Sequence, residues 1–145
     1  MIKLTAFLLL TMSWTITFSQ HTSNTSEESI RKIIADKVAT YNKQDWAGEK
    51  KTLSDSVKVY EFPNAIRDST SDGLISRHSK TFAKYPKNKA EIFDIYIVGN
   101  KAILKEKITG RGEPFYSALI YEFDNDKIVK IWVISNSPTT QRPKD

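Results

Sequence analysis

The sequence predicts an α+β fold in which helices pack on one face of a curved antiparallel sheet. Two observations indicate this class. Early in the chain, apolar residues recur at helical spacing, whereas from position 90 onward short runs of strand-forming residues alternate with turn pairs. The 145 residues, with 39% apolar and 27% charged side chains, suit one globular domain with its own core.

The N-terminus has the pattern of a secretory signal peptide over residues 1–19. Lys3 gives it a positive start, LTAFLLL begins its apolar run, and TFS places small residues before a cut ahead of Gln20. The alternative is an uncleaved anchor. With cleavage, we expect an exported protein, periplasmic or extracellular, that keeps no stable membrane anchor. A flexible polar leader at 20–25 and a polar tail at 136–145 then flank a domain at 26–135.

The composition argues against several classes of function. There is no cysteine, so neither a disulfide nor a lipid-carrying cysteine is available. Two histidines, one of them in the leader, leave no plausible metal-ligand cluster, and no glycine-rich phosphate loop occurs. We therefore expect no metal and no cofactor. The net charge of +5 is scattered and forms no arginine-rich stripe, so we expect no nucleic acid partner.

A first helix is expected to follow Thr25, which has capping-box spacing to Glu28. Its predicted apolar face contains Ile30, Ile33, Ile34, Val38 and Tyr41.

Two further helices are expected ahead of Pro86. Asp45 caps a short second helix over 46–53, and Ser69 or Ser71 caps a third over 71–85. Between them, SVKVYEFP reads as a strand and NAIRDSTSDG as a loop.

The pair Gly99-Asn100 predicts a two-residue hairpin turn, which fixes the register of the strands on either side. In that register Asp94 lies opposite Lys105 on an amphipathic outer face, and Phe93 lies opposite Glu106 on a nearly apolar inner face.

Glu106 is the odd member of that inner face, because Leu104 and Ile108 flank it. A carboxylate on an apolar face is costly unless it is paired or lies in a polar cavity, and burial would raise its pKa toward the range useful for proton transfer. Alternatively, the inner face is exposed to solvent at that point, or Glu106 forms a hydrogen bond with a nearby backbone group.

His78 is the second candidate residue. It lies between Leu74 and Phe82 at helical spacing, and it is either a core residue or a partner of Glu106.

The last strand, KIVKIWVI, follows a turn at Asn125-Asp126 that pairs Asp124 with Lys127. This strand is apolar on both faces, and such strands are usually buried by other structure on both faces. Helices can cover one face, and a second subunit is the simplest cover for the other, so we expect a homodimer formed through the sheet.

Several motifs together resemble one known group of proteins. YNKQDW, LSDSVKVYEFP, TFAKYP, AEIFDIYIVGNKAILKEKITGRGEP and ALIYEFDNDKIVKIWVI are similar to the SnoaL-like branch of the nuclear transport factor 2-like (NTF2-like) superfamily, the bacterial proteins often labelled steroid isomerase-like. The resemblance implies a cone of three helices on a bent sheet, with a mostly apolar pocket between them and frequent dimers. Isomerases, cyclases and simple binding proteins share this fold, so it does not give the function.

The departures from that pattern concern the acidic residues. Where the resemblance places the aspartates of ketosteroid isomerases, this chain has Phe62 and Leu119, which argues against steroid isomerase chemistry. Where SnoaL-like relatives often have Asp-His-Glu, it has Leu104, Lys105 and Glu106, so only the glutamate remains.

Three hypotheses for function follow. The first is an exported protein that holds a small apolar molecule without catalysis; the expected pocket lining is Tyr41, Tyr60, Phe62, Phe82, Phe93 and Tyr121. The second is an acid/base enzyme of isomerase, cyclase or hydratase type that uses Glu106 and His78. The third is a protein-interaction module, for which the pocket should be filled by the protein's own side chains.

Overall fold

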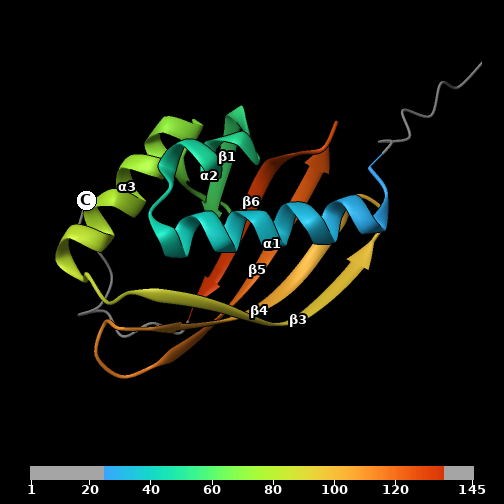
Figure 1. Ribbon diagram of the computed structural model, residues 1–145. Helices are drawn as coiled ribbons and strands as arrows, with labels where there is room; N and C mark the ends of the chain where they lie inside the picture. The colour runs from blue at the N-terminus through green and yellow to red at the C-terminus, as the bar shows by residue number, and fades with distance from the viewer. Residues whose placement is uncertain (1–24, 136–145) are drawn as a thin grey trace, which may run out of the picture.

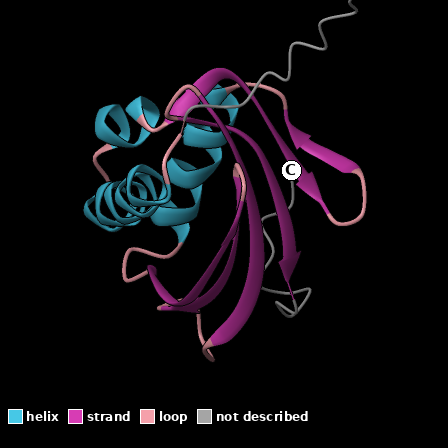
Figure 2. Cartoon of the chain, turned by 90° about the vertical axis from the view of Figure 1, so that its right-hand side faces the viewer, coloured by secondary structure: helices cyan, strands magenta, loops and turns pink. Residues whose placement is uncertain are grey.

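The computed structural model describes residues 25–135; the expected signal peptide, nearly all of the leader and the tail lie outside this range. The helices are α1 (Glu27–Lys43), α2 (Trp46–Lys51) and α3 (Ser71–Lys84), and the strands are β1 (Leu53–Glu61), β2 (Ala65–Asp68), β3 (Lys89–Val98), β4 (Lys101–Thr109), β5 (Phe115–Asp124) and β6 (Lys127–Ser135). All three helices lie on one side of a bent sheet (Figures 1 and 2), as the α+β prediction requires. None of the helices in residues 25–135 is long and apolar enough to cross a membrane.

Asp45 caps α2 as predicted, whereas the caps of α1 and α3 differ by one residue from those expected. Ser26, not Thr25, caps α1 by accepting a hydrogen bond from the backbone N–H of Ser29, whereas the Thr25 hydroxyl accepts one from the backbone of Asp126. Thr70, rather than either neighbouring serine, caps α3. Each segment offers several hydroxyls in a row, and the tertiary position of the chain selects among them.

The sheet order is β2-β1-β6-β5-β4-β3. All neighbours are antiparallel except β1 and β6, which run parallel, so the sheet is not a simple meander. The expectation of a loop over NAIRDSTSDG is wrong in part, because Ala65–Asp68 pairs with β1 as β2. The residues of β2 are mostly exposed and follow no apolar alternation, so the pairing itself makes the strand.

The predicted hairpin register is confirmed from Val98↔Lys101 to Asp94↔Lys105. Beyond that point a β-bulge at Phe93 shifts the pairing, and Ile92 instead of Phe93 lies opposite Glu106. The expected turn at Asn125-Asp126 is also present, with Asp124 opposite Lys127.

The two faces of the sheet can be followed as rows of paired residues. One row, Tyr96–Ile103–Ile120–Trp132–Tyr60, crosses five strands on the outer face, away from the helices. The next row, Ile97–Ala102–Tyr121–Ile131–Val59, crosses the same strands on the inner face and belongs mostly to the core. The inner face thus packs on the helices, while Tyr96 is 68% exposed on the other side.

Candidate functional site

A cavity of about 160 Å³ lies between α1, α3 and the inner face of the sheet. Apolar side chains from five strands and from α1 and α3 supply much of its wall: Val38, Val59, Leu74, Ala90, Ile108, Phe115, Leu119, Ile131 and Val133. Charged and polar side chains also reach it: Lys37, Tyr41, Glu61, Arg67, Arg77, His78, Thr81, Glu106, Arg111, Ser117, Tyr121 and Ser135. The cavity is therefore more polar than the apolar pocket expected from the sequence.

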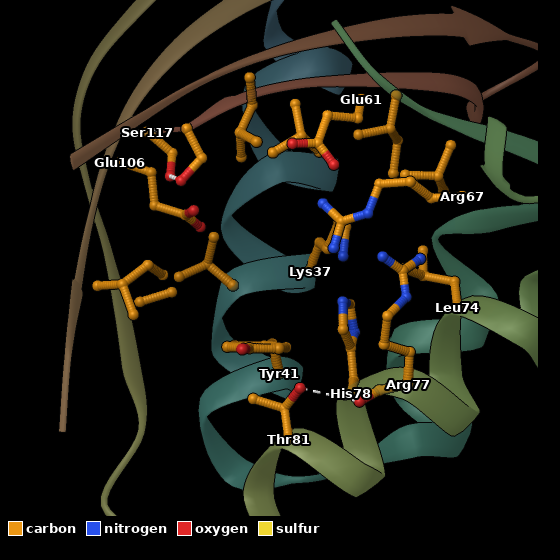
Figure 3. Close-up of a pocket in the computed structure, with 18 of the residues that line it drawn as sticks. Lys37, Tyr41, Glu61, Arg67, Leu74, Arg77, His78, Thr81, Glu106 and Ser117 are labelled. Carbon is orange, nitrogen blue, oxygen red and sulfur yellow. Dashed lines mark hydrogen bonds between the residues drawn. The ribbon is translucent and has the colours of Figure 1, made fainter. Parts of the chain in front are cut away.

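Glu106 lies in a polar row on the inner face. In this row β4, β5 and β6 place Glu106 beside Ser117, and Ser117 beside Ser135, with the two serine hydroxyls 3.3 Å apart. The Glu106 carboxylate is half-buried and points from the sheet into the cavity (Figure 3). No residue of the described chain donates a hydrogen bond to it.

The pKa of Glu106 is raised to about 7. Burial is the main cause, because it disfavours the charged form, and the positive charges of Lys37 and Arg111 offset only part of it. A carboxyl with this pKa exchanges its proton near neutral pH, which is the property required of a general acid or base.

A buried ionic network joins the three helices on the other side of the cavity. The Lys37 ammonium on α1 lies 2.5 Å from the Glu49 carboxylate on α2, and these side chains are 6% and 0% exposed. The Nδ1 atom of His78 on α3 lies 3.0 and 3.2 Å from the two Glu49 oxygens. Burial opposes the charge on Glu49, but Lys37 and the hydrogen bond from His78 outweigh it and lower the pKa of Glu49 to about 2.

This network defines the state of His78. Burial lowers the pKa of His78, although the bond to Glu49 opposes that shift, so the ring is neutral at pH 7. Because an ionised Glu49 can only accept hydrogen bonds, Nδ1 carries the proton and Nε2 carries the lone pair. Tyr41 packs edge-on against the ring, at 4.8 Å between centroids.

The hypothesis of a direct pair between His78 and Glu106 is not supported. Both residues line the same cavity, but no hydrogen bond or ion pair joins them, and His78 is paired with Glu49 instead.

A second polar cluster holds Arg111, in the turn between β4 and β5. Its Nε donates to the Asn88 side-chain oxygen at 2.5 Å, and one terminal nitrogen donates to the Tyr41 hydroxyl at 3.1 Å. Asn88 also donates to Tyr41, at 2.7 Å. The turn approaches its neighbour closely at Gly110, where φ is +80° and a Cβ atom would lie 1.9 Å from the Lys87 carbonyl oxygen, so only glycine fits.

The structure places the six expected lining aromatics in different environments. Tyr41 and Tyr121 line the cavity, and burial raises the pKa of both, so their hydroxyls keep their protons. Phe82 is buried behind Tyr41, 5.1 Å away between ring centroids, and lies outside the lining.

The expectation that Tyr60, Phe62 and Phe93 line the cavity is wrong. On β1 the inward positions are Val59 and Glu61, so Tyr60 faces outward and stacks on Trp132, and Phe62 is 57% exposed. Side chains alternate between the two faces of a strand, so an error of one residue in assigning the inward positions places every side chain on the wrong face. Phe93 is 51% exposed because the bulge turns it away from the inner face.

Sequence reasoning missed Lys37, Glu49 and Arg111. A signal existed for Lys37, because it continues the helical spacing of Ile30 and Ile34 toward Tyr41 and so had to lie on the buried face of α1. We find no comparable signal for Glu49, in a short charged helix, or for Arg111, in an apparent surface turn. Within residues 25–135 no group of three His, Asp or Glu side chains could hold a metal ion.

Comparison with known proteins supports the fold assignment. No protein family model matches the sequence, and no curated protein matches it. Among solved structures, an uncharacterised cystatin-fold protein from Novosphingobium aromaticivorans is 26% identical, with a TM-score of 0.66 over 71% of this chain and 95% of its own. An NTF2-like protein of unknown function from Burkholderia xenovorans is 22% identical, with a TM-score of 0.67 over 82% and 96%.

A protein from Kribbella flavida described as a candidate ketosteroid isomerase is 13% identical, with a TM-score of 0.67 over 81% of this chain and 84% of its own. Other similar structures are described as NTF2-like proteins or candidate polyketide cyclases. The chain therefore has the NTF2-like cone fold that the sequence motifs predicted.

The buried network leads to a first prediction. Lys37→Met leaves the Glu49 carboxylate buried without its cation, and we expect a loss of about 3–5 kcal/mol in the free energy of unfolding. Lys37→Met combined with Glu49→Gln should recover much of this loss, because no uncompensated charge remains. Urea denaturation measures both.

Lys32→Met is the matched control, since Lys32 pairs with Asp36 on the exposed face of the same helix and should cost no more than about 0.5 kcal/mol. Equal effects of the two single substitutions would contradict a special role for the buried pair.

A second prediction concerns Glu106 and pH. Its folded-state pKa of about 7 exceeds the ordinary value of 4.5, so its ionisation destabilises the folded state progressively as pH rises from 4.5 through 7. Glu106→Gln removes this penalty. The variant should be more stable than the parent at pH 8, by at most about 3 kcal/mol, and the difference should shrink toward pH 4.5.

Urea denaturation at pH 5 and pH 8 tests this. Glu91→Gln, at an exposed position on β3, should show no such pH-dependent gain. The assigned environment of Glu106 is incorrect if Glu106→Gln changes stability equally at both pH values.

Proposed function

We propose that this protein is an exported member of the superfamily that binds a small organic molecule in the cavity of the cone. One observation carries the proposal: the half-buried Glu106 carboxyl faces a cavity of about 160 Å³ without a hydrogen-bond partner among residues 25–135. The carboxyl lies on the wall of an open cavity, so a ligand bound there can supply the hydrogen-bond partner that these residues do not.

The lining narrows the kind of molecule. An engineered apolar cavity of about 150 Å³ binds benzene, so the space suits a molecule of roughly one ring. Leu119 and Val133 offer apolar contact next to the polar row of Glu106, Ser117 and Ser135. The ligand expected from the sequence was apolar; the polar wall favours an apolar body that carries a polar group.

Acid/base catalysis is the second candidate, and a specific arrangement favours it. Glu106, with its pKa of about 7, can give or take a proton, and His78, oriented by Glu49, presents a neutral imidazole to the same cavity. Leu119 lines the cavity where ketosteroid isomerases are expected to place an acid, so their mechanism is not the one we propose.

The interaction-module alternative is less favoured. It predicted a cavity filled by the protein's own side chains, whereas this cavity remains open.

Identification of a co-purified ligand tests the proposed function. Mass spectrometry of protein isolated from its own cells should reveal a small organic compound, and Glu106→Gln should carry at least about tenfold less of it, since a buried partner is lost. Glu91→Gln is the control and should retain the compound. A parent protein without any bound compound, or equal loading of Glu106→Gln, would count against the proposal.

The same compound separates binding from catalysis. If the parent protein converts it to an isomer or a hydrated product while Glu106→Gln does not, the acid/base candidate is favoured; if both leave it unchanged, the protein is a binder.

We further propose that the protein is a homodimer joined through the outer face of the sheet. The apolar row defined above runs through the middle of this face, with Tyr96 and Ile103 68% and 45% exposed. The neighbouring row is charged, and Lys101 and Lys130 both contact Glu122 within it. An apolar centre with a polar border is the usual anatomy of a protein interface.

Native mass spectrometry tests this dimer and the proposed export together. The expected species has twice the mass of a chain that begins at Gln20. Ile103→Glu should give the monomer because it places a charge at the centre of the interface, whereas the parent as a monomer would contradict the dimer. A chain that begins at Met1 would contradict signal cleavage.

A further inference from the structure

We propose that Arg111 forms a carboxylate-binding subsite at one end of the cavity, so that the ligand is a small organic acid whose carboxylate accepts hydrogen bonds from the Arg111 guanidinium. This inference rests on the proposed binding function and specifies the chemical class of the ligand.

The first argument is the pairing of Arg111. Its two hydrogen bonds go to neutral groups, the Asn88 amide and the Tyr41 hydroxyl, and no carboxylate of residues 25–135 lies within ion-pairing distance. A guanidinium has five N–H groups, so three remain after these bonds, all on the two terminal nitrogens that form its outer edge. That edge matches a carboxylate in a two-bond, side-by-side arrangement.

The second argument is the rigidity of the arrangement. Asn88 and Tyr41, which hold the guanidinium, are only 4% and 7% exposed, and Phe115 contributes a cation–π contact at 5.8 Å. The close contact of Gly110 with the backbone at Lys87 holds the turn itself. A donor that is already in place loses little conformational entropy on binding.

The third argument is the contrast with the other cations of the lining. Lys37 is paired with Glu49, and Arg77 contacts Asp68. Arg67 is exposed on β2, which is one edge strand of the sheet. Arg111 lies near the other edge strand, β3, because it is bound to Asn88, the residue before that strand. Among the cations that line the cavity in residues 25–135, Arg111 thus stands out because it is half-buried and its hydrogen-bond partners are neutral.

Glu106 is compatible with a bound carboxylate. Burial raises its pKa to about 7, so below that pH its carboxyl is mostly neutral and can donate a hydrogen bond instead of repelling the ligand. Both residues line the same cavity, and the positive charge of Arg111 acts on the Glu106 carboxyl without a hydrogen bond or ion pair between them.

Paired probes test the subsite: benzoate against benzamide, and cyclohexanecarboxylate against cyclohexanecarboxamide, measured by calorimetric titration at pH 6. Each pair differs mainly in charge. We expect each acid to bind at least about tenfold more tightly than its amide, because only the acid forms a charge-assisted pair. Arg111→Gln should remove this preference by weakening the acids much more than the amides, and Arg111→Lys should keep part of it.

Arg31→Gln is the control and should preserve the preference, since Arg31 lies outside the cavity lining, on α1, where it pairs with Glu27. The melting temperature of each ligand-free variant verifies folding. If the amides bind as tightly as the acids, or if Arg111→Gln retains the preference, the carboxylate subsite is wrong while the binding function stands. If neither member of any pair binds, the proposed binding function fails as well.

Discussion

The arrangement of the three helices depends on one buried interaction, the ion pair between Lys37 and Glu49. It joins α1 to α2, and the hydrogen bond from His78 extends it to α3. A buried ion pair of this kind contributes little net stability compared with apolar packing, but a misaligned arrangement would leave a charge uncompensated. The pair therefore favours one relative position of the helices, and that position forms the helical side of the cavity.

The sheet forms the wall of the cavity opposite the helices, and the register of its strands determines which side chains face inward. Glu106, Ser117 and Ser135 become neighbours because three strands align in one register, and a bulge next to this row removes Phe93 from the inner face. The β-bulge thus has two effects: it bends the strand locally, and it determines which side chain lies beside Glu106. An aromatic ring inside the cone at that position would occupy space that is now open.

The polar groups of the cavity fall into two sets with different roles. The Lys37–Glu49–His78 network is satisfied within the protein and supports the helices, whereas Glu106 and the terminal edge of Arg111 remain available to a ligand. Structures of the same fold are described as candidate isomerases and cyclases, but the cone alone does not carry such an activity. The proposed binding of a ligand rests on these particular side chains, and Phe62 and Leu119 stand where the sequence motifs place the acids of ketosteroid isomerases.

The sequence by itself determined the α+β class, the order of the three helices, the strands from position 90 onward, the two hairpin turns and the inward position of Glu106, because periodicity and turn residues are local signals. It could not assign the parity of β1, since Val57 and Val59 on one face and Tyr60 and Phe62 on the other are equally apolar. It could not reveal β2 or the parallel pairing of β1 with β6, which arise between distant segments. The partnership of Glu49 with Lys37 and the approach of Arg111 to Tyr41 join residues 12 and 70 positions apart, so only the tertiary structure decided them.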